Sequence, residues 1–444
     1  MYFLFNLFLI TNSIYAAADA KFAGLTKQEL GFNVSVENVG QGNGVVVIDN
    51  NTGKRMVVDA GSSKHPATHP LEHFLASVQH QPDYLASMPV TFVVSHPDKD
   101  HLNLFVKLLT GIEKKIKNNQ KVKFYLGGPF EKYLTSKDAL KFLSAILEMK
   151  NCKIESLSHA LTKLEIKARY DEAVALAKAF KNKDPIGFED VQTAITRTVG
   201  LTIKGKVRPC ILRSLIPEFS EGTRVGTEIV IANAGHPLVR VYPVASATGP
   251  TINSFESDTM PDEVVNPDEN TSSIVLRFSF FNNAYSMLIT GDATGITTDR
   301  VLRHYPSASS NSLVSDFVLA CHHGSITEES NNTEWVEAIK PKHVIFSSEQ
   351  YDGYHHPQFD AFWNYLRSPR LENAKKAHDF VCARKSSRKL PISPHVSNLA
   401  EDSKSGDYSW YKFKTDKSIY STMSSGNIKI SVLPGKGIDI TVEK

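Results

Sequence analysis

Four side chains of the kinds that bind metal ions lie within six consecutive residues: His96, Asp98, Asp100 and His101. They follow the apolar run 91–94, whose β-branched and aromatic residues predict a buried strand. The end of a buried strand is the usual place for an active site in an open α/β sheet. Imidazole and carboxylate groups at alternating positions suit a hydrolytic divalent metal, and two such pairs are enough for two ions. The alternative interpretation is a polar loop whose charges are satisfied by its neighbours.

Four further strand-like runs lead to residues of the same kinds. The residues that follow these runs, in chain order, are Asp59, Asp292, the pair His322 and His323, and the pair His355 and His356. Ligands from separate strand ends converge at one rim of an open sheet, so we expect these side chains to join the first group. The spacing does not decide which histidine of each pair binds metal.

The stretch from His96 to His101 resembles the His-x-His-x-Asp-His signature of the metallo-β-lactamase superfamily, with Asp98 in place of the second histidine. That variant is similar to the hydrolase domain of ComEC-type late-competence proteins, which take up DNA. Other stretches that fit the same subgroup in the same order are Val39–Gly42, Val57–Gly61, Leu288–Ala293, Cys321–Ser325 and His356–Pro357. The resemblance covers roughly residues 32 to 110, 235 to 365 and, more weakly, 408 to 444.

The resemblance implies an α/β (α+β) fold, the metallo-β-lactamase αββα sandwich of two mixed sheets with helices outside. It also implies two divalent metal ions, zinc or manganese, with the ligands His96, Asp98, Asp100, His101, Asp292, His323 and His356. The residues to which it gives catalytic roles are Asp59, Asp100 and His322. By the same resemblance Asp292 bridges the ions, and Asp59 orients the ligands without binding metal itself. Because Asp98 makes half of the site harder and more anionic, we expect Mn²⁺ to support activity at least as well as Zn²⁺.

The chain has 444 residues, 41% of them hydrophobic, and a net charge of +3, which is typical of an ordinary globular protein. Residues 1–18 resemble a signal peptide, although no lysine or arginine precedes their apolar run. If they are a signal, the protein is periplasmic or secreted; a buried or disordered N-terminus would leave it cytoplasmic. No later segment reaches the ~20 apolar residues of a membrane helix, so we expect a soluble mature chain. Residues 24–444 are expected to form one hydrolase domain.

Two stretches of the chain are strongly basic. Residues 107–183 hold 17 Lys and Arg against 8 Asp and Glu, and the apolar spacing predicts a mostly helical insertion over about 131–225. Residues 367–389 hold eight basic and two acidic side chains, which indicates a basic arm over about 367–390, near the substrate entrance. A basic face beside a metal site would attract nucleic acid or another phosphate-containing substrate. A solvated helix surface is the plainer interpretation, and no protein partner is inferable.

The remaining histidines and the cysteines carry weaker signals. His65, His69 and His73 have helical spacing that could indicate a further metal site, but the two intervening prolines disfavour one continuous helix. We expect a solvated loop that leads into a helix starting near Pro70. His236 lies where many superfamily members supply a further ligand, which the ComEC-like subgroup lacks. The four cysteines stand too far apart for a zinc ribbon, and their pairing in an oxidising compartment stays open.

The leading hypothesis is a metal-dependent hydrolase, a phosphodiesterase or nuclease that acts through a hydroxide bridging the two metals. The runner-up is hydrolysis of a small ester, thioester or lactam by the same metals. A pocket for such small neutral substrates would not need the two basic stretches. A catalytically inactive binding protein that keeps the fold is the hypothesis from a different class. Metal content would separate this last hypothesis from the first two.

Overall fold

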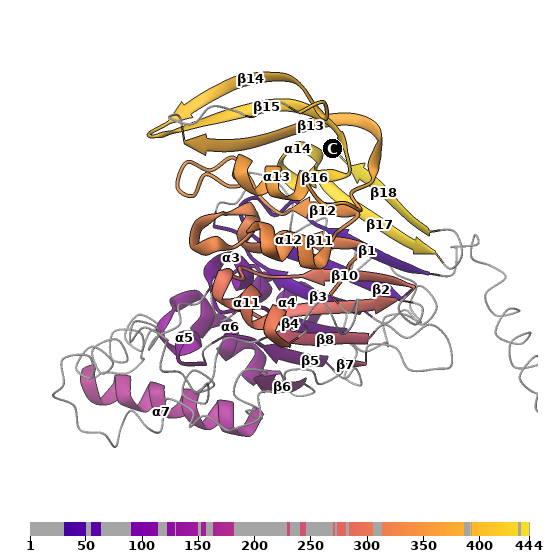
Figure 1. The fold of residues 1–444 in the computed structure, drawn as a ribbon. Helices are drawn as coiled ribbons and strands as arrows, with labels where there is room; N and C mark the ends of the chain where they lie inside the picture. Colours follow the sequence, from indigo (N-terminus) through magenta and orange to yellow (C-terminus); the bar gives the residue numbers. More distant parts are fainter. Residues whose placement is uncertain are drawn as a thin grey trace, which may run out of the picture.

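Three β-sheets and the helices around them make up the described part of the chain (Figure 1). The computed structural model describes residues 31–49, 55–63, 90–113, 122–128, 130–149, 152–156, 163–181, 229–230, 240–245, 270, 273–280, 284–304, 313–385, 391, 393–433 and 437–443.

The first sheet contains eight described strands in the spatial order β18-β17-β1-β2-β3-β4-β5-β6. Their bounds are β1 (Phe32–Val36), β2 (Gly44–Asp49), β3 (Arg55–Ala60), β4 (Val90–Val94), β5 (Val122–Leu126), β6 (Cys152–Ser156), β17 (Asn427–Leu433) and β18 (Gly437–Glu443). β1 pairs antiparallel with β2 and β17, whereas β3, β4, β5 and β6 run parallel. β4 is buried along its whole length, because both of its faces are covered, and this explains its nearly continuous apolar sequence.

The second sheet contains seven described strands in the order β16-β12-β11-β10-β9-β8-β7. Their bounds are β7 (Ile229–Val230), β8 (Arg240–Ala245), β9 (Val275–Phe280), β10 (Tyr285–Ile289), β11 (Phe317–Leu319), β12 (His343–Phe346) and β16 (Ile419–Ser421). β9 and β10 pair antiparallel, while β10, β11, β12 and β16 run parallel.

The two sheets pack face to face, and helices cover their outer faces. Apolar side chains from both sheets meet between them, among them Phe32 and Val93 of the first sheet and Phe278 and Leu319 of the second. The helices over the first sheet are α4 (Phe105–Glu113), α5 (Phe130–Thr135), α6 (Lys137–Glu148) and α7 (Lys163–Lys181). Those over the second are α11 (Gly295–His304), α12 (Thr333–Ile339) and α13 (Phe359–Leu366). The predicted αββα sandwich with mixed sheets is therefore confirmed.

The carboxyl ends of the parallel strands lead to the loops that hold the candidate ligands. β3 ends with Asp59 and Ala60, and β4 runs into the short helix α3 (Lys99–Leu102). In the second sheet, β10 leads to Asp292 and β11 leads to the 3₁₀ turn η3 (Cys321–Gly324). Because strands from both sheets end here, their loops can share one site.

The described part of the stretch 131–225, expected to be a mostly helical insertion, includes a strand of the first sheet. α5 and α6 are helical, but the next described segment is strand β6, which pairs in parallel with β5 and extends the first sheet. Leu140 and Leu143 of α6 are buried in the core on that sheet. Residues up to 156 therefore continue the sandwich. Of the remainder, α7 is helical, and 182–228 lie outside the described residues.

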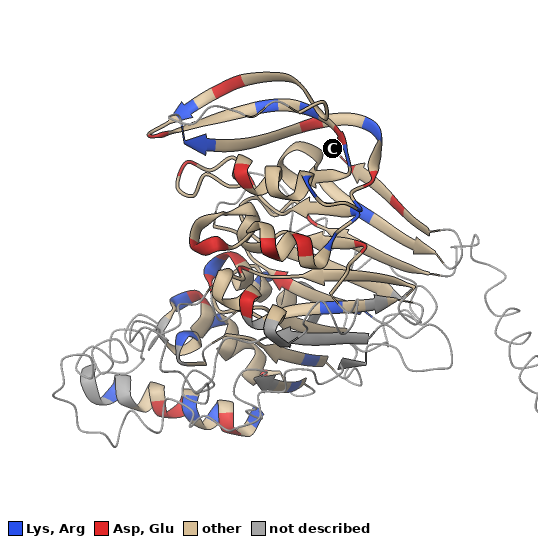
Figure 2. Cartoon of the chain, in the orientation of Figure 1, with Lys and Arg blue, Asp and Glu red and all other residues tan. Residues whose placement is uncertain are grey.

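The stretch 367–390, expected to be a basic arm, contains a strand of the third sheet. This sheet has the order β13-β15-β14, with β13 (Asn373–Lys385), β14 (Val396–Ser405) and β15 (Tyr408–Lys417), and it lies at one end of the sandwich (Figure 1). Phe380 of β13 packs against Phe362 of α13, with ring centroids 4.9 Å apart. Arg384 pairs with Asp360 at 3.1 Å. Because apolar packing and an ion pair fix β13, its residues are part of a sheet and do not form a separate arm. Acidic and basic residues are interspersed on the third sheet and along α7 (Figure 2).

Some residues singled out in the sequence fall outside the described part of the chain. They are residues 1–18, the trio His65, His69 and His73, and His236. Among the cysteines that the structure describes, Cys152, Cys321 and Cys382 are free thiols. None of the described helices combines the length and the apolar character needed to cross a membrane.

Candidate metal centre

The turn from β4 into α3 presents four of the candidate ligands at one point. His96 and His101 are fully buried, whereas Asp98 and Asp100 are partly exposed. Asp98 occupies the N-cap position of α3, so Asp100 and His101 belong to its single turn. A strand end followed at once by a helical turn therefore brings residues from one short stretch together.

Close backbone contacts fix α3 against the end of β3. A Cβ atom on Gly61 would lie 2.3 Å from the backbone nitrogen of His101, and one on Gly42 would lie 2.8 Å from the backbone oxygen of Asp100. The backbone N–H of Asn43 donates to that same Asp100 oxygen at 3.0 Å. Because only glycine permits such an approach, these two glycines position Asp100 and His101.

Asp59 lies behind the cluster and holds His101. Its Oδ2 is 2.8 Å from His101 Nδ1, and its two oxygens accept hydrogen bonds from the Ser95 backbone N–H at 2.7 Å and the Ser95 hydroxyl at 2.8 Å. Asp59 is fully buried and has a φ of 57°, a conformation that persists only where the surroundings impose it. The carboxylate is thus placed to orient a histidine that faces a metal.

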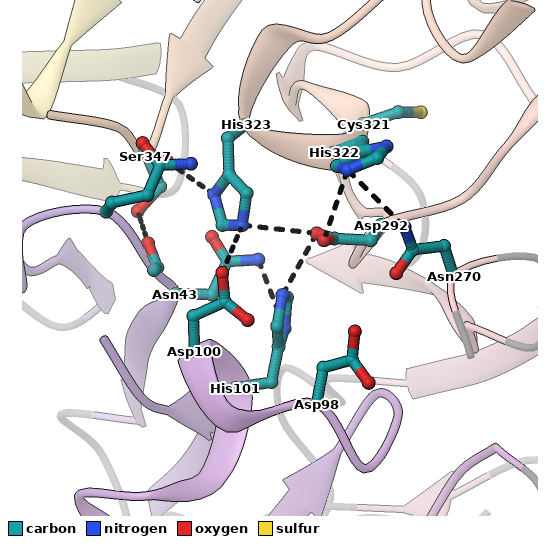
Figure 3. A network of polar contacts seen from close by, with 12 residues as sticks. Asn43, Asp98, Asp100, His101, Asn270, Asp292, Cys321, His322, His323 and Ser347 are labelled. Carbon is teal, nitrogen blue, oxygen red and sulfur yellow. Dashed lines mark hydrogen bonds and ion pairs between the residues drawn. The ribbon is translucent and has the colours of Figure 1, made fainter. Parts of the chain in front are cut away.

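The carboxylate of Asp292 stands at the centre of the cluster (Figure 3). Its Oδ1 lies 3.0 Å from His101 Nε2 and 3.4 Å from His323 Nε2. Its Oδ2 lies 4.0 Å from His96 Nε2 and 3.8 Å from His322 Nε2. Each oxygen of Asp292 therefore faces its own pair of histidines.

One further carboxylate stands beside each of these histidine pairs. Asp100 Oδ2 is 3.7 Å from His323 Nε2, and Asp98 Oδ2 is 3.7 Å from His96 Nε2. Two overlapping triads have ligand atoms within 4.8 Å of one another: His96, His101 and Asp292, and Asp100, His101 and His323. The structure thus brings together residues from both sheets that are more than 200 positions apart in the sequence.

Three of the histidines are anchored through Nδ1 and turn Nε2 toward Asp292. His96 Nδ1 lies 3.1 Å from the Ser273 hydroxyl, and His323 Nδ1 lies 2.7 Å from the Ser347 carbonyl. His101 Nδ1 lies 2.8 Å from Asp59 Oδ2. None of the three buried Nε2 atoms forms a hydrogen bond of good geometry with any described residue, and the short contact of His101 Nε2, at 3.0 Å, is with the Asp292 carboxylate. Buried polar atoms are rarely left in this state, and three converging nitrogens beside carboxylates fit a bound cation.

The turn η3 holds both histidines of the first pair in a left-handed conformation. The φ angles are 48° at His322 and 54° at His323, and the His322 N–H donates to the Gly291 carbonyl at 3.0 Å. Asn331 fixes the start of the turn, because its side chain accepts from the Cys321 N–H at 3.1 Å and donates to the Cys321 carbonyl at 2.8 Å. This backbone turns both neighbouring imidazoles toward the same carboxylate.

His322 differs from the three anchored histidines. Its Nδ1 has no hydrogen-bond partner among the described residues, and its Nε2 lies 3.4 Å from the Asn270 amide. Burial lowers the pKa of His322 more than the Asp292 carboxylate raises it. With 16% of its side chain exposed, against 1% for His323, His322 is the more accessible of the two.

The two histidines of the second pair point in different directions. The His355 ring stacks on Tyr408 with centroids 4.3 Å apart, and its Nε2 lies 3.2 Å from the Ser405 hydroxyl, on the third sheet. The buried His356 ring lies 5.3 Å from His322. Only His356 is therefore on the side of the cluster. No ion pair joins it to the acids in the part of the chain that the structure describes, so metal binding by His356 stays a prediction.

The buried acids impose a strong electrostatic demand for positive charge. Burial lowers the pKa of His101, but the Asp292 and Asp59 carboxylates outweigh it and raise that pKa well above the ordinary value. Burial likewise raises the pKa of Asp292, yet the surrounding histidines bring it well below the ordinary value. Among the described residues, every ion pair of Asp292 is with a histidine. Divalent cations supply the missing charge without requiring the histidines to be protonated.

Sequence reasoning missed the residues that hold the ligands in place. Ser273 and Ser347 anchor two histidines, Ser95 contacts Asp59, and Asn331 fixes the histidine turn. Serine and asparagine are common loop residues, so their types carried no signal. Only Ser95 could have been singled out from the sequence, because it directly precedes His96, the first residue of the motif.

No protein-family model and no curated protein matches the sequence. Among solved structures, the chain is similar to the metallo-β-lactamase fold protein YhfI from Bacillus subtilis, at 9% identity and a TM-score of 0.34, over 76% of this chain and 93% of that one. It is also similar to a diphosphatase from the PhnP family, at 10% identity and a TM-score of 0.31, over 71% of this chain and 85% of that one. At these values the function has to be inferred from the site itself.

Proposed function

We propose that this protein is a metal-dependent hydrolase that cleaves phosphodiester bonds with the help of two divalent ions. The observation that carries the proposal is the position of Asp292, whose two oxygens face two different pairs of histidine nitrogens. A carboxylate shared in this way is chemically suited to bridge two ions, because each oxygen is able to bind one of them.

The candidate ligands lie around the two oxygens of Asp292, with His101 within reach of both sides. Asp100, His101, His323 and Oδ1 of Asp292 would hold one ion, and His96, Asp98 and Oδ2 of Asp292 would hold the other. His356 is a further candidate for the second group. Because this group has fewer ligands and includes the partly exposed Asp98, its ion would keep positions open for water and substrate.

The protein groups around the ions would orient them and move protons. Paired divalent ions, when bound, activate a water molecule and neutralise the charge that develops on the leaving oxygen. His322 is accessible and its pKa is lowered by burial, so near neutral pH its imidazole is uncharged and able to accept or return a proton. Asp59 keeps the His101 ring in position through Nδ1.

A chromogenic diester, bis(p-nitrophenyl) phosphate, tests this proposal with the Mn²⁺-loaded or Zn²⁺-loaded protein. Asp292→Asn should lower kcat by on the order of 10³-fold or more, because the shared ligand is lost. Asp299→Asn on α11, which lies outside the cluster, is the matched control and should leave kcat unchanged.

Two outcomes would contradict the proposal. A metal-loaded protein that is inert on diesters but cleaves a thioester or a lactam would be a hydrolase of the other class. A folded protein that binds no divalent metal would point to a binding function, for which the cluster would be only a buried polar network.

A further inference from the structure

Tyr354 is a large aromatic residue left exposed next to the candidate centre. About half of its surface, 49%, is accessible, although most large apolar or aromatic side chains of the described residues are buried. Its ring is nearly parallel to the ring of His356, with an interplanar angle of 3° and centroids 6.2 Å apart. The ring of Tyr354 thus lies beside one histidine of the site, while a large part of the residue remains in contact with solvent.

A hydrogen bond connects the Tyr354 phenol to the acids of the centre. Its partner is Ser63. The Ser63 hydroxyl itself donates to Asp100 Oδ2 at 3.0 Å. A substrate group that contacts Asp100 would therefore lie next to Tyr354.

The segment that carries Tyr354 is anchored, so its exposed ring is held in place. Gln350 Nε2 donates to the Ser403 hydroxyl at 3.0 Å, and Asp352 Oδ1 accepts from Trp410 Nε1 at 3.3 Å. Together with the stacking of His355 on Tyr408, these contacts fasten the segment to the third sheet. An aromatic ring that is already ordered loses little entropy when a ligand packs on it.

A tight turn brings the ring of Tyr351 next to the ring of Tyr354. The backbone carbonyl of Tyr351 accepts from the N–H of Tyr354 at 3.2 Å and from that of His355 at 2.9 Å, and the two tyrosine rings lie 5.3 Å apart. A Cβ atom on Gly353 would lie 2.6 Å from the Tyr351 ring, so glycine is what allows the ring to fold back over the turn. The two ring planes are tilted by 59°, so Tyr351 packs against Tyr354 and supports this aromatic platform without extending its stacking face.

We propose that Tyr354, supported by Tyr351, is the stacking site for a nucleobase attached to the phosphate that is cleaved. This inference rests on the proposed function and narrows its substrate class to nucleotide-containing phosphodiesters. Aromatic side chains stack on nucleobases without needing hydrogen bonds to the base edges, because every base offers a π-face. The platform would accept different bases and would fix the adjoining phosphate near Asp100 and Asp292.

Two dinucleotides that differ only in their bases test the platform: one carries both bases, and its abasic counterpart carries none. The metal-loaded wild type should cleave the base-bearing dinucleotide with a kcat/KM about tenfold or more above the abasic one. Tyr354→Leu should raise KM for the base-bearing substrate to the abasic level and leave kcat, metal content and abasic cleavage unchanged. Tyr354→Phe, which keeps the ring and removes the hydroxyl, should retain the preference.

A binding measurement gives a readout that does not depend on turnover. By calorimetry, a nucleoside 5′-monophosphate should bind the wild type about tenfold or more tightly than ribose 5-phosphate, and Tyr354→Leu should abolish the difference. Tyr170→Leu on α7, at the other end of the sandwich (Figure 1), is the matched control and should preserve it.

Failure of the platform and failure of the hydrolase proposal give different results. Equal cleavage of both dinucleotides by the wild type would overturn the stacking proposal and leave the hydrolase standing. An equal loss on both substrates in Tyr354→Leu would show a general structural role and would also overturn it. No cleavage of either dinucleotide, or of the chromogenic diester, by the metal-loaded wild type would overturn both.

Discussion

The contacts of Nδ1 separate the four histidines nearest Asp292 into two kinds. In His96, His101 and His323 this atom lies beside a serine hydroxyl, a carboxylate and a backbone carbonyl, respectively. Such contacts fix the ring and leave Nε2 available as a ligand atom. His322 has no such contact among the described residues, so it keeps the freedom that a proton carrier needs.

Replacing Asp59 tests whether it acts through His101. Asp59→Asn removes the negative charge next to His101 Nδ1, and asparagine tolerates the positive φ of this position. We expect the metal affinity to fall by roughly 10- to 100-fold, measured by competition with a chromophoric chelator. Asp299→Asn should leave the affinity unchanged. An unchanged affinity in Asp59→Asn would mean that Asp59 only stabilises the fold.

Asp98 should determine the metal preference. A carboxylate in place of an imidazole favours a harder ion, so Mn²⁺ is expected to support activity at least as well as Zn²⁺. Asp98→His should shift the preference toward Zn²⁺, as measured by reconstitution of the metal-free protein with each ion. Strict zinc dependence of the wild type would contradict this assignment.

At the scale of elements, the turn η3 depends on one buried side chain from a neighbouring loop. Asn331 bonds the Cys321 N–H and carbonyl, donates to the Ser325 carbonyl at 2.5 Å, and accepts from the Tyr365 hydroxyl at 2.9 Å. Positive φ angles at the non-glycine residues His322 and His323 persist only when such contacts over-determine them.

Removing the Asn331 side chain should therefore affect both the fold and the site. Asn331→Ala leaves buried backbone groups of η3 without partners, which should lower the free energy of unfolding by about 2 to 3 kcal/mol. Metal affinity should also fall, because the ligand His323 loses its fixed orientation. Chemical denaturation and chelator competition measure the two effects. A destabilised variant with full metal affinity would show that the turn holds its shape without Asn331.

The strand His343–Phe346 contributes a pH dependence that is independent of the metal centre. Burial lowers the pKa of His343 to about 4, while Glu372 opposes this change and Lys342 adds to it. The unfolded chain has a histidine pKa of about 6.5 and so binds the proton first. Stability should therefore fall as pH decreases from about 6.5 to 4, by on the order of 3 kcal/mol from this group.

His343→Gln isolates this contribution. The variant should show a shallower loss of unfolding free energy than the wild type between pH 6.5 and 4, measured by denaturation at several pH values. Identical pH dependences in the two proteins would mean that His343 is protonated in the folded state as readily as in the unfolded chain.

The strand ends were predictable from the sequence, whereas the assignment of the basic stretches was not. The residues before Asp59, His96, Asp292 and His322 form nearly continuous apolar runs. Such runs are typical of strands that are buried on both faces. β6 was missed because its five residues, Cys152–Ser156, are mostly polar and its pairing with β5 is a tertiary contact. β13 was missed because two of its basic residues, Lys375 and Arg384, pair with acids distant in sequence, Asp439 and Asp360.

The candidate ligands were predictable as a set, but not their individual orientations. His355 and His356 have the same residue type and are adjacent, so only the stacking of His355 on the third sheet separates them. The same holds for His322 and His323, whose difference lies in an Nδ1 contact with Ser347. Such choices depend on packing between elements that no local pattern encodes.

At the scale of the whole molecule, the sandwich gathers several buried or partly buried carboxylates at one rim. The acids Asp59, Asp98, Asp100 and Asp292 reach this rim from both sheets. Without cations, these neighbouring carboxylates repel one another unless the histidines between them take up protons. Binding of metal should therefore stabilise the whole fold, since it links the loops of both sheets.

The number of divalent ions bound per chain tests the central claim most directly. Protein reconstituted with Mn²⁺ or Zn²⁺, freed of excess ion and analysed by elemental mass spectrometry, should contain about two ions per chain. Asp292→Asn should contain fewer, because both ions lose a shared ligand, and Asp299→Asn should match the wild type. A wild-type protein with one ion or none, or an Asp292→Asn variant that keeps two, would contradict the two-metal centre.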